Sequence, residues 1–246
     1  MTETYKPTAE LSVPTTLPLT QAAIDGFARD GFISIEKVID DDLLEELRTL
    51  YDELLAGKFE GEQDDRQLGG LIRQVIQPSR AHPRFRDNPA LDTARELVRT
   101  LGGVSDPEMA FDMLIYKQPG NTNPTPWHQD ASYRAMPFAE AGTPINNSEV
   151  TVWIPLDDAD PENGCMQFIL GAHLQPLRPH YVFSADPADD GRLLATDEYD
   201  VSEAVVCPVR AGGCTVHTGG TLHFTGGNLT ADRARRAYIS TWGPRS

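Results

Sequence analysis

The segment Pro126-Trp127-His128-Gln129-Asp130 decides how the rest of this 246-residue sequence is interpreted. His128 and Asp130 are two residues apart, so on a β-strand both side chains would point to the same face. One imidazole nitrogen and one carboxylate oxygen can then bind a single metal ion from one side. A His-x-Asp pair alone is weak evidence, because it occurs by chance in many unrelated proteins. The pair therefore needs a further ligand from a distant strand.

That ligand has two candidates in the segment 213–228, where His217 and His223 stand six residues apart. Geometry alone does not choose between them. Two neutral imidazole nitrogens and one carboxylate suit non-haem iron(II) and leave three coordination positions open. The sequence then continues to Arg235 and Arg236 on an apolar strand. A permanently charged arginine near the metal would bind the free carboxylate of a cosubstrate.

The residues before Met109 predict mainly helices. After Asp40, leucines recur at three- and four-residue steps as far as Leu54, a spacing typical of an amphipathic helix. Acidic residues crowd the first turn of this segment, where the helix dipole favours them. The predicted elements are a helix at Thr20–Arg29, a strand at Phe32–Val38, a helix that begins at Asp40 and a helix at Asn88–Leu101.

From Met109 onward the pattern changes to short β-rich runs separated by glycine, proline or aspartate. The predicted strands are Met109–Lys117, Val150–Leu156, Cys165–Leu170, Val205–Val209, Cys214–Val216 and Arg236–Trp242. Short strands after a helical start favour a mainly β fold, a jelly roll (double-stranded β-helix) buttressed by the N-terminal helices.

The sequence shows no internal repeat or linker, so we expect one domain over residues 1–246. Residues 1–20 are polar and rich in proline and threonine, and we expect them to be flexible or extended. The acidic, turn-rich stretch 184–203 is expected to be a surface insertion that could cover a site.

The composition argues against several classes of binding partner. The formal charge of −16, from 37 acidic and 21 basic residues, argues against nucleic acid and anionic lipid. The sequence contains no apolar run of about 18 residues that could span a membrane, and the N-terminus lacks the apolar core of a signal peptide. We therefore expect a cytoplasmic protein that acts on a small molecule. The oligomeric state is not indicated.

Five ordered elements resemble the phytanoyl-CoA dioxygenase family of iron(II)- and 2-oxoglutarate-dependent oxygenases. Ala172 stands where serine or threonine is usual in that family. Asp130 is present, whereas related halogenases carry a small residue there, so the resemblance implies oxygenation rather than halogenation. The matching elements are Phe27–Ile33, Trp127–Asp130, Val152–Ala159, Glu162–His173 and His223–Ala237.

The resemblance implies Fe(II) as the metal, with 2-oxoglutarate and O2 as cosubstrates. It implies His223 as the distal ligand beside His128 and Asp130, because His223 stands five residues before Asn228, as the family's ligand does. His217 remains the alternate.

The resemblance also implies that Arg235 pairs with the distal (C5) carboxylate of 2-oxoglutarate. Arg236 is an alternative, because the spacing from His223 is one residue longer than expected. Three further residues are implied to contact 2-oxoglutarate or line its pocket. Three more are candidates for substrate contact, and a structural role is the alternative for each of these three. The first set is Thr225, Trp153 and Gln129, and the second is Lys117, His173 and His180.

The activity implied is hydroxylation of an unactivated C–H bond in a small metabolite or natural-product intermediate, with release of succinate and CO2. The same chemistry can desaturate, epimerise or cyclise a substrate. Three alternatives stay open, namely an acyl-CoA hydroxylase, a non-catalytic jelly-roll protein that binds a metal or ligand, and a cupin-like enzyme without a keto acid. Coenzyme A is disfavoured because the chain lacks a basic cluster outside its C-terminal arginines.

Overall fold

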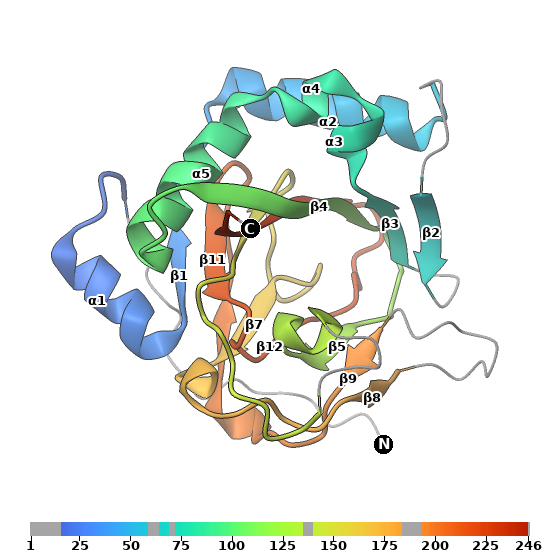
Figure 1. Ribbon diagram of the computed structural model, residues 1–246. Coiled ribbons are helices and arrows are strands. Elements are labelled where there is room, and N and C mark those ends of the chain that lie inside the picture. Colours follow the sequence, from blue (N-terminus) through green and yellow to red (C-terminus); the bar gives the residue numbers. More distant parts are fainter. Residues whose placement is uncertain (1–15, 59–63, 69–71, 135–139, 184–192, 246) are drawn as a thin grey trace.

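The computed structural model describes residues 16–58, 64–68, 72–134, 140–183 and 193–245. Two antiparallel sheets form its centre (Figure 1). In sheet order, the larger one contains β1 (Phe32–Ile35), β11 (Cys214–Thr218), β6 (Val150–Pro155), β13 (Arg235–Pro244), β4 (Pro107–Lys117), β3 (Ile72–Ile76) and β2 (Asp64–Leu68). The smaller one contains β10 (Ala204–Cys207), β7 (Met166–Ile169), β12 (His223–Thr225) and β5 (Thr125–His128).

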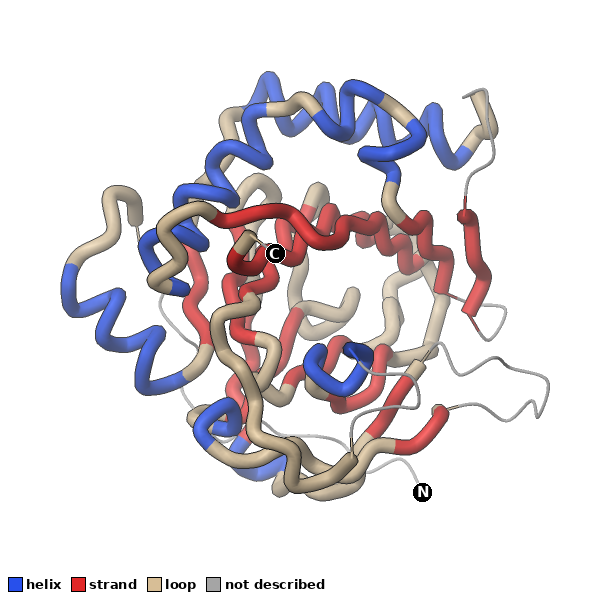
Figure 2. Tube along the Cα trace, in the orientation of Figure 1, coloured by secondary structure: helices blue, strands red, loops and turns tan. Residues whose placement is uncertain are grey.

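Helices gather along one side of the larger sheet (Figure 1, Figure 2). Thr20 and Asp40 begin the first two helices, because their side chains accept hydrogen bonds from the backbone N–H groups of Ala23 and Leu43. Within the described ranges, no helix is both long and apolar enough to cross a membrane. The helices are α1 (Gln21–Asp30), α2 (Asp41–Leu55), α3 (Pro78–Ala81), α4 (Pro83–Arg86) and α5 (Pro89–Gly102).

The larger sheet has an apolar core on each face, and β13 contributes to both. Tyr238 and Trp242 pack with the leucines of α2 and α5. Ala237 and Ile239 pack instead with residues of β7 and β10 in the smaller sheet. Side chains of a strand alternate between faces, so the odd-numbered residues of β13, including Arg235, face the space between the sheets.

The predicted jelly roll with N-terminal helices is confirmed, and the six predicted strands correspond to β4, β6, β7, β10, β11 and β13. His128 and Asp130 were expected on the same strand, but only His128 lies on one. β5 ends at His128, and Asp130 begins the 3-10 helix η1 (Asp130–Arg134). A turn rather than strand alternation therefore brings the carboxylate back toward the histidine.

The described part of the expected surface insertion, residues 193–203, is mixed, because residues 197–203 are exposed and residues 193–196 are not. Leu193, Leu194, Ala195 and Thr196 are buried, and Leu194–Ala195 forms β9, which pairs with β8 (Tyr181–Val182). A short apolar run inside an acidic stretch accounts for this burial. Residues 184–192, like residues 1–15 of the expected flexible N-terminus, lie outside the described residues.

Candidate metal centre and ligand cavity

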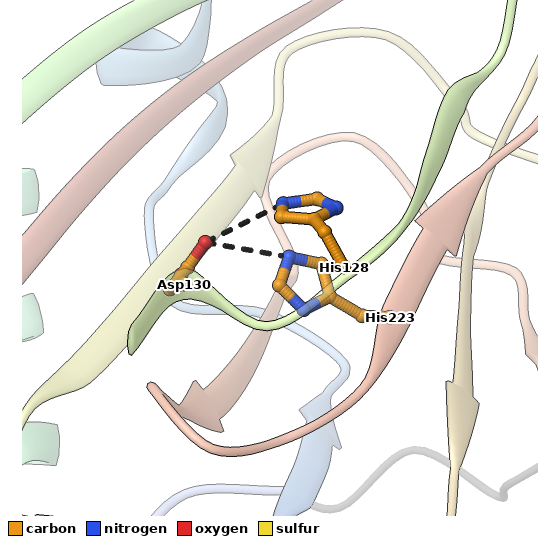
Figure 3. Close-up of side chains that lie close together, drawn as sticks. All are labelled: His128, Asp130 and His223. Carbon is orange, nitrogen blue, oxygen red and sulfur yellow. Dashed lines mark ion pairs between the residues drawn. The ribbon is translucent and has the colours of Figure 1, made fainter. Parts of the chain in front are cut away.

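Three side chains converge between the two sheets. His128 ends β5, and its direct partner across the ladder is His223, the first residue of β12. The Asp130 Oδ1 atom lies 3.5 Å from Nε2 of His128 and 3.6 Å from Nε2 of His223. Figure 3 shows both rings and the carboxylate pointing toward one another. Metal–ligand bonds of about 2.1 Å at right angles place ligand atoms about 3 Å apart, so this spacing suits one ion.

Both rings of this group are fixed in the tautomer that a metal needs. Nδ1 of His128 lies 2.8 Å from the carbonyl oxygen of Pro126, and Nδ1 of His223 lies 2.9 Å from that of Thr221. A carbonyl oxygen only accepts hydrogen bonds, so each Nδ1 carries the proton and each Nε2 offers a lone pair. Burial, together with the neighbouring His128 and His217, holds the pKa of His223 well below its usual range. His223 is therefore neutral at neutral pH.

The Asp130 carboxylate is ionised and held from the larger sheet. Burial acts to raise its pKa, but the neighbouring His223, His128 and His217 outweigh burial and keep the pKa well below the usual range. Its Oδ2 atom accepts a hydrogen bond of 2.9 Å from Thr151 of β6. The Thr151 hydroxyl lies 3.1 Å from that of Thr241 on β13. Because Thr151 gives its own proton to Asp130, Thr241 is the donor of this second bond.

His217 lies beside this group but on the other sheet. Its Nε2 atom is 3.3 Å from Oδ2 of Asp130, on the side away from the oxygen that His128 and His223 share. Neither ring nitrogen makes a well-directed hydrogen bond with any described residue. The structure therefore places the alternate ligand near the centre, while the three converging atoms belong to His128, Asp130 and His223.

A cavity of about 480 Å³ opens from this centre, and Arg235 lines it. The Arg235 side chain is 1% exposed, and none of its three nitrogens finds a hydrogen-bond partner in the described part of the chain. Burial lowers its pKa to about 10, so the guanidinium stays charged at neutral pH. A buried charge without a partner costs several kcal/mol. A carboxylate in the cavity would satisfy it with paired hydrogen bonds.

Arg236 has a different environment. It donates hydrogen bonds to Asp157 and Asp52 on the opposite, helix-covered face of the sheet. These bonds raise the pKa of Arg236. Of the two arginines considered from the sequence, Arg235 is thus the one that reaches the cavity.

A sequence model of the phytanoyl-CoA dioxygenase family matches residues 27–237, most of the chain. The chain belongs to the phytanoyl-CoA dioxygenase family. The matched range contains the three converging side chains and Arg235.

Among curated members of this family, the phytanoyl-CoA dioxygenase domain-containing protein 1 of Rattus norvegicus is 31% identical over 173 residues. The match covers 68% of this chain and 55% of the rat protein. The protein of the same name from Mus musculus is 31% identical over 175 residues, with the same coverage. The chain thus spans about half the length of the curated relatives it matches.

Solved structures show the same fold. The structure of EvdO2 from Micromonospora carbonacea var. aurantiaca complexed with 2-oxoglutarate superposes with a TM-score of 0.76 at 29% identity, and covers 94% of this chain and 93% of EvdO2. SnoN, described as a non-heme alpha ketoglutarate dependent epimerase from nogalamycin biosynthesis, has a TM-score of 0.67 at 22% identity, over 91% of this chain and 82% of SnoN. The second likeness concerns the fold alone.

Three residues that the sequence suggested as ligand contacts lie near Arg235. They are Trp153, Thr225 and Lys117. Trp153 lines the cavity, and the Arg235 guanidinium lies over its ring, 5.7 Å from the centroid. Thr225 also lines the cavity, and its hydroxyl accepts a hydrogen bond of 2.9 Å from Lys117. Lys117 also donates to the carbonyl oxygens of Thr225 and Gly226. Burial, and secondarily the charge of Arg235, hold the pKa of Lys117 well below its usual range. Lys117 thus positions Thr225.

Gln129 faces away from this cavity. Its amide nitrogen donates to the carbonyl oxygen of Gly220, and its amide oxygen accepts from the backbone N–H of Arg178. Its own backbone N–H donates to Nε2 of His180, while Nδ1 of that ring bonds the carbonyl oxygen of Arg178. Gln129 and His180 therefore fix the turn that joins His128 of β5 to Asp130 of η1.

His173 also lies away from the cavity lining. It sits in the 3-10 helix η2 (Ala172–Leu174), and its ring packs under Gly31, where an added Cβ would come within 2.4 Å of Nδ1. Its Nε2 atom lies 3.1 Å from the carbonyl oxygen of Ala28. These contacts join η2 to the junction of α1 and β1, which is a structural role.

Sequence reasoning missed several polar residues of the cavity. Thr151 and Thr241 lie within predicted strands, but only the strand register shows that their hydroxyls lead to Asp130. Gln74 and Tyr133 also line the cavity. In the sequence Gln74 stands beside Arg73 within Ile72–Ile76, a mixed polar and apolar pattern that by itself fits any half-buried strand.

Proposed function

We propose that the chain is an iron(II)- and 2-oxoglutarate-dependent oxygenase whose metal is bound by His128, Asp130 and His223. One observation carries the proposal: the buried guanidinium of Arg235, which has no hydrogen-bond partner among the described residues, shares a cavity with these three side chains. A protein that bound only a metal would not need a carboxylate partner at that position. The crystallised complex of the similar protein EvdO2 with 2-oxoglutarate supports the assignment.

Iron(II), 2-oxoglutarate and O2 together supply the oxidising power for a C–H bond, with succinate and CO2 as products. The chain supplies position and protection from water. Arg235 pairs with the distal carboxylate of 2-oxoglutarate, and Thr225, held through its oxygen by Lys117, donates its proton to the same group. His128, Asp130 and His223 would hold the metal and would leave coordination positions open for the cosubstrate and O2. Thr151 holds the Asp130 carboxylate in place through its hydrogen bond.

We further propose hydroxylation of an unactivated C–H bond in a small metabolite or natural-product intermediate as the overall reaction, carried out by one domain. The cavity of about 480 Å³ has to hold both the cosubstrate and the substrate. A net charge of −16 disfavours the phosphates of an acyl-CoA. Residues from both sheets line the one cavity, so neither sheet would form the site alone.

The test is succinate release from 2-oxoglutarate by the purified protein with iron(II), in the presence and absence of O2. The wild type is expected to form succinate slowly even without substrate, and only with both iron and O2. Asp130→Ala should lower this rate at least about 100-fold, because the iron then lacks its anionic ligand. Asp106→Ala, which removes an exposed carboxylate, is the matched control and should keep the wild-type rate. Folded, iron-loaded wild type that forms no succinate would favour a non-catalytic binding protein.

A further inference from the structure

The strands β3 and β4 form a wall of the cavity. On β3, Arg73 and Val75 face the helices: Arg73 donates to the carbonyl oxygen of Leu55 in α2, and Val75 belongs to the core beneath α2 and α5. The alternating residues Gln74 and Ile76 therefore face the cavity, which both of them line. Their register partners on β4 are Ile115 and Met113, which line it too. Gln74 is the polar member of this apolar group.

The Gln74 side chain is only 9% exposed, and no hydrogen bond joins its amide to another described residue. Gln129 provides a comparison within the same molecule, because both ends of its buried amide are bonded to backbone groups. Among the described residues the Gln74 amide has no such partner, and it opens into the cavity, where a bound molecule would gain a hydrogen bond from it. The Gln74 amide, which can donate and accept, is thus available to a molecule in the cavity.

The described lining of the cavity offers the substrate no charge that the proposed function leaves unused. Apart from histidines, the acidic and basic side chains among its described lining residues are Asp130 and Arg235, and the proposed function uses both. Around Gln74 the lining is apolar, with Ile76, Phe111 and Met113 as examples. An ionised group placed against this wall would lose its hydration without gaining a partner. The wall therefore selects against carboxylates, phosphates and amines.

We propose that the substrate is an uncharged, mainly apolar small molecule with a hydroxyl or carbonyl group that hydrogen-bonds the Gln74 amide. The inference rests on the proposed function, which assigns Asp130 to the metal and Arg235 to the cosubstrate. It goes further by naming the substrate class and a residue that selects it. It also separates this chain from an acyl-CoA hydroxylase, whose substrate carries several negative charges.

The test uses two matched series of probes: menthol, p-menthane and p-menthane-3-carboxylate, and 1-indanol, indane and indane-1-carboxylate. Binding is followed by NMR of the glutamine side-chain amides, in protein loaded with 2-oxoglutarate and with Zn(II) in place of iron to prevent turnover. The amide signals that disappear in Gln74→Leu identify Gln74. Binding of 2-oxoglutarate is measured in the same samples, so a failed cosubstrate site is distinguished from a failed Gln74 contact.

We expect the alcohols to shift the Gln74 amide signals and to bind about five- to ten-fold more tightly than the hydrocarbons, the effect of one added hydrogen bond. Gln74→Leu should abolish this advantage while the hydrocarbons still bind. Gln118→Leu, an exposed glutamine just after β4, should leave it unchanged. The inference is overturned if the carboxylates bind most tightly, if the alcohols keep their advantage in Gln74→Leu, or if no probe binds protein that holds 2-oxoglutarate.

Discussion

Two adjacent arginines of β13 lie in different environments. Arg235 faces the cavity, where its guanidinium has no partner among the described residues, whereas Arg236 faces the helices and pairs with Asp157 and Asp52. The difference follows from the alternation of side chains along β13. Arg235 is therefore assigned to ligand binding and Arg236 to stability, and the two residues can be tested by the same substitution.

Arg235→Ala should weaken 2-oxoglutarate binding about 100-fold or more, because truncating one partner of a buried charge pair costs about 2–5 kcal/mol. Iron(II) binding should change little. Arg236→Ala should lower the thermal midpoint and leave 2-oxoglutarate binding within about two-fold of wild type. Isothermal titration of the metal-loaded variants measures both constants. If only Arg236→Ala lost 2-oxoglutarate binding, the carboxylate would be bound by Arg236 and not by Arg235.

Among the individual residues of the site, the sequence predicted those that belong to a motif and missed those that do not. The His-x-Asp pair, His223 and Arg235 belong to the elements that resemble the family, although Arg235 lies one residue further from His223 than expected, and all four come together in the structure. Gln129 belongs to the same motif but bonds to backbone groups outside the cavity, because side-chain direction beyond a turn is not encoded in spacing. Gln74 has no motif, and its role depends on the register between β3 and β4.

At the scale of elements, the turn before β7 supports the cosubstrate end of the cavity. Gly164 has a φ of +90°, and a Cβ added there would lie 2.3 Å from the carbonyl oxygen of Gly226. The same oxygen accepts a hydrogen bond from Lys117, which also holds the Thr225 hydroxyl. Close backbone contact at Gly164 is therefore linked to the position of Thr225.

Gly164→Ala should lower the free energy of unfolding by about 3 kcal/mol and also weaken 2-oxoglutarate binding, because left-handed strain and a backbone collision add together. Gly57→Ala is the control, since Gly57 also has a positive φ, of +68°, but an added Cβ there meets nothing within 4 Å. It should cost about 1 kcal/mol and leave binding unchanged. Chemical denaturation and calorimetry measure the two effects. Equal losses in both variants would contradict the proposed contact.

The sequence predicted the helices α2 and α5 and the mostly apolar strands, including β7 and β10 with four residues each. It missed two short strands that carry much of the site. β12 and β5 contain histidine and threonine, so neither forms an apolar run. The hairpin of β2 and β3 was hidden because the residues of β2 are mostly polar.

For the whole molecule, the proposed metal would join parts of the fold that lie far apart in sequence. Its ligands come from β5, η1 and β12, and Thr151 links Asp130 to the larger sheet. A ligand that binds only the folded state stabilises it by mass action. The jelly roll itself followed from the sequence of helices and short strands, whereas its cavity depends on contacts between sheets that no local pattern encodes.

Iron(II) and 2-oxoglutarate together, each at about 100 times its dissociation constant and without O2, should raise the thermal midpoint by at least about 5 °C. This corresponds to about 2.7 kcal/mol for one site and about 2–4 °C per kcal/mol at this chain length. A chelator should reverse the shift, and differential scanning calorimetry measures it. In Asp130→Ala the iron-dependent part should be lost. A full shift in that variant would place the metal elsewhere.

The metal and cosubstrate assignment is tested most directly by an anaerobic titration of the metal-free protein with iron(II) and 2-oxoglutarate, followed through the visible charge-transfer band of iron bound to a keto acid. We expect a band in the wild type and in His217→Ala, and none in His223→Ala. Absence of the band in folded, iron-binding wild type would show that 2-oxoglutarate does not bind the iron. A band that survives in His223→Ala and is lost in His217→Ala would show that the metal is bound by the other histidine.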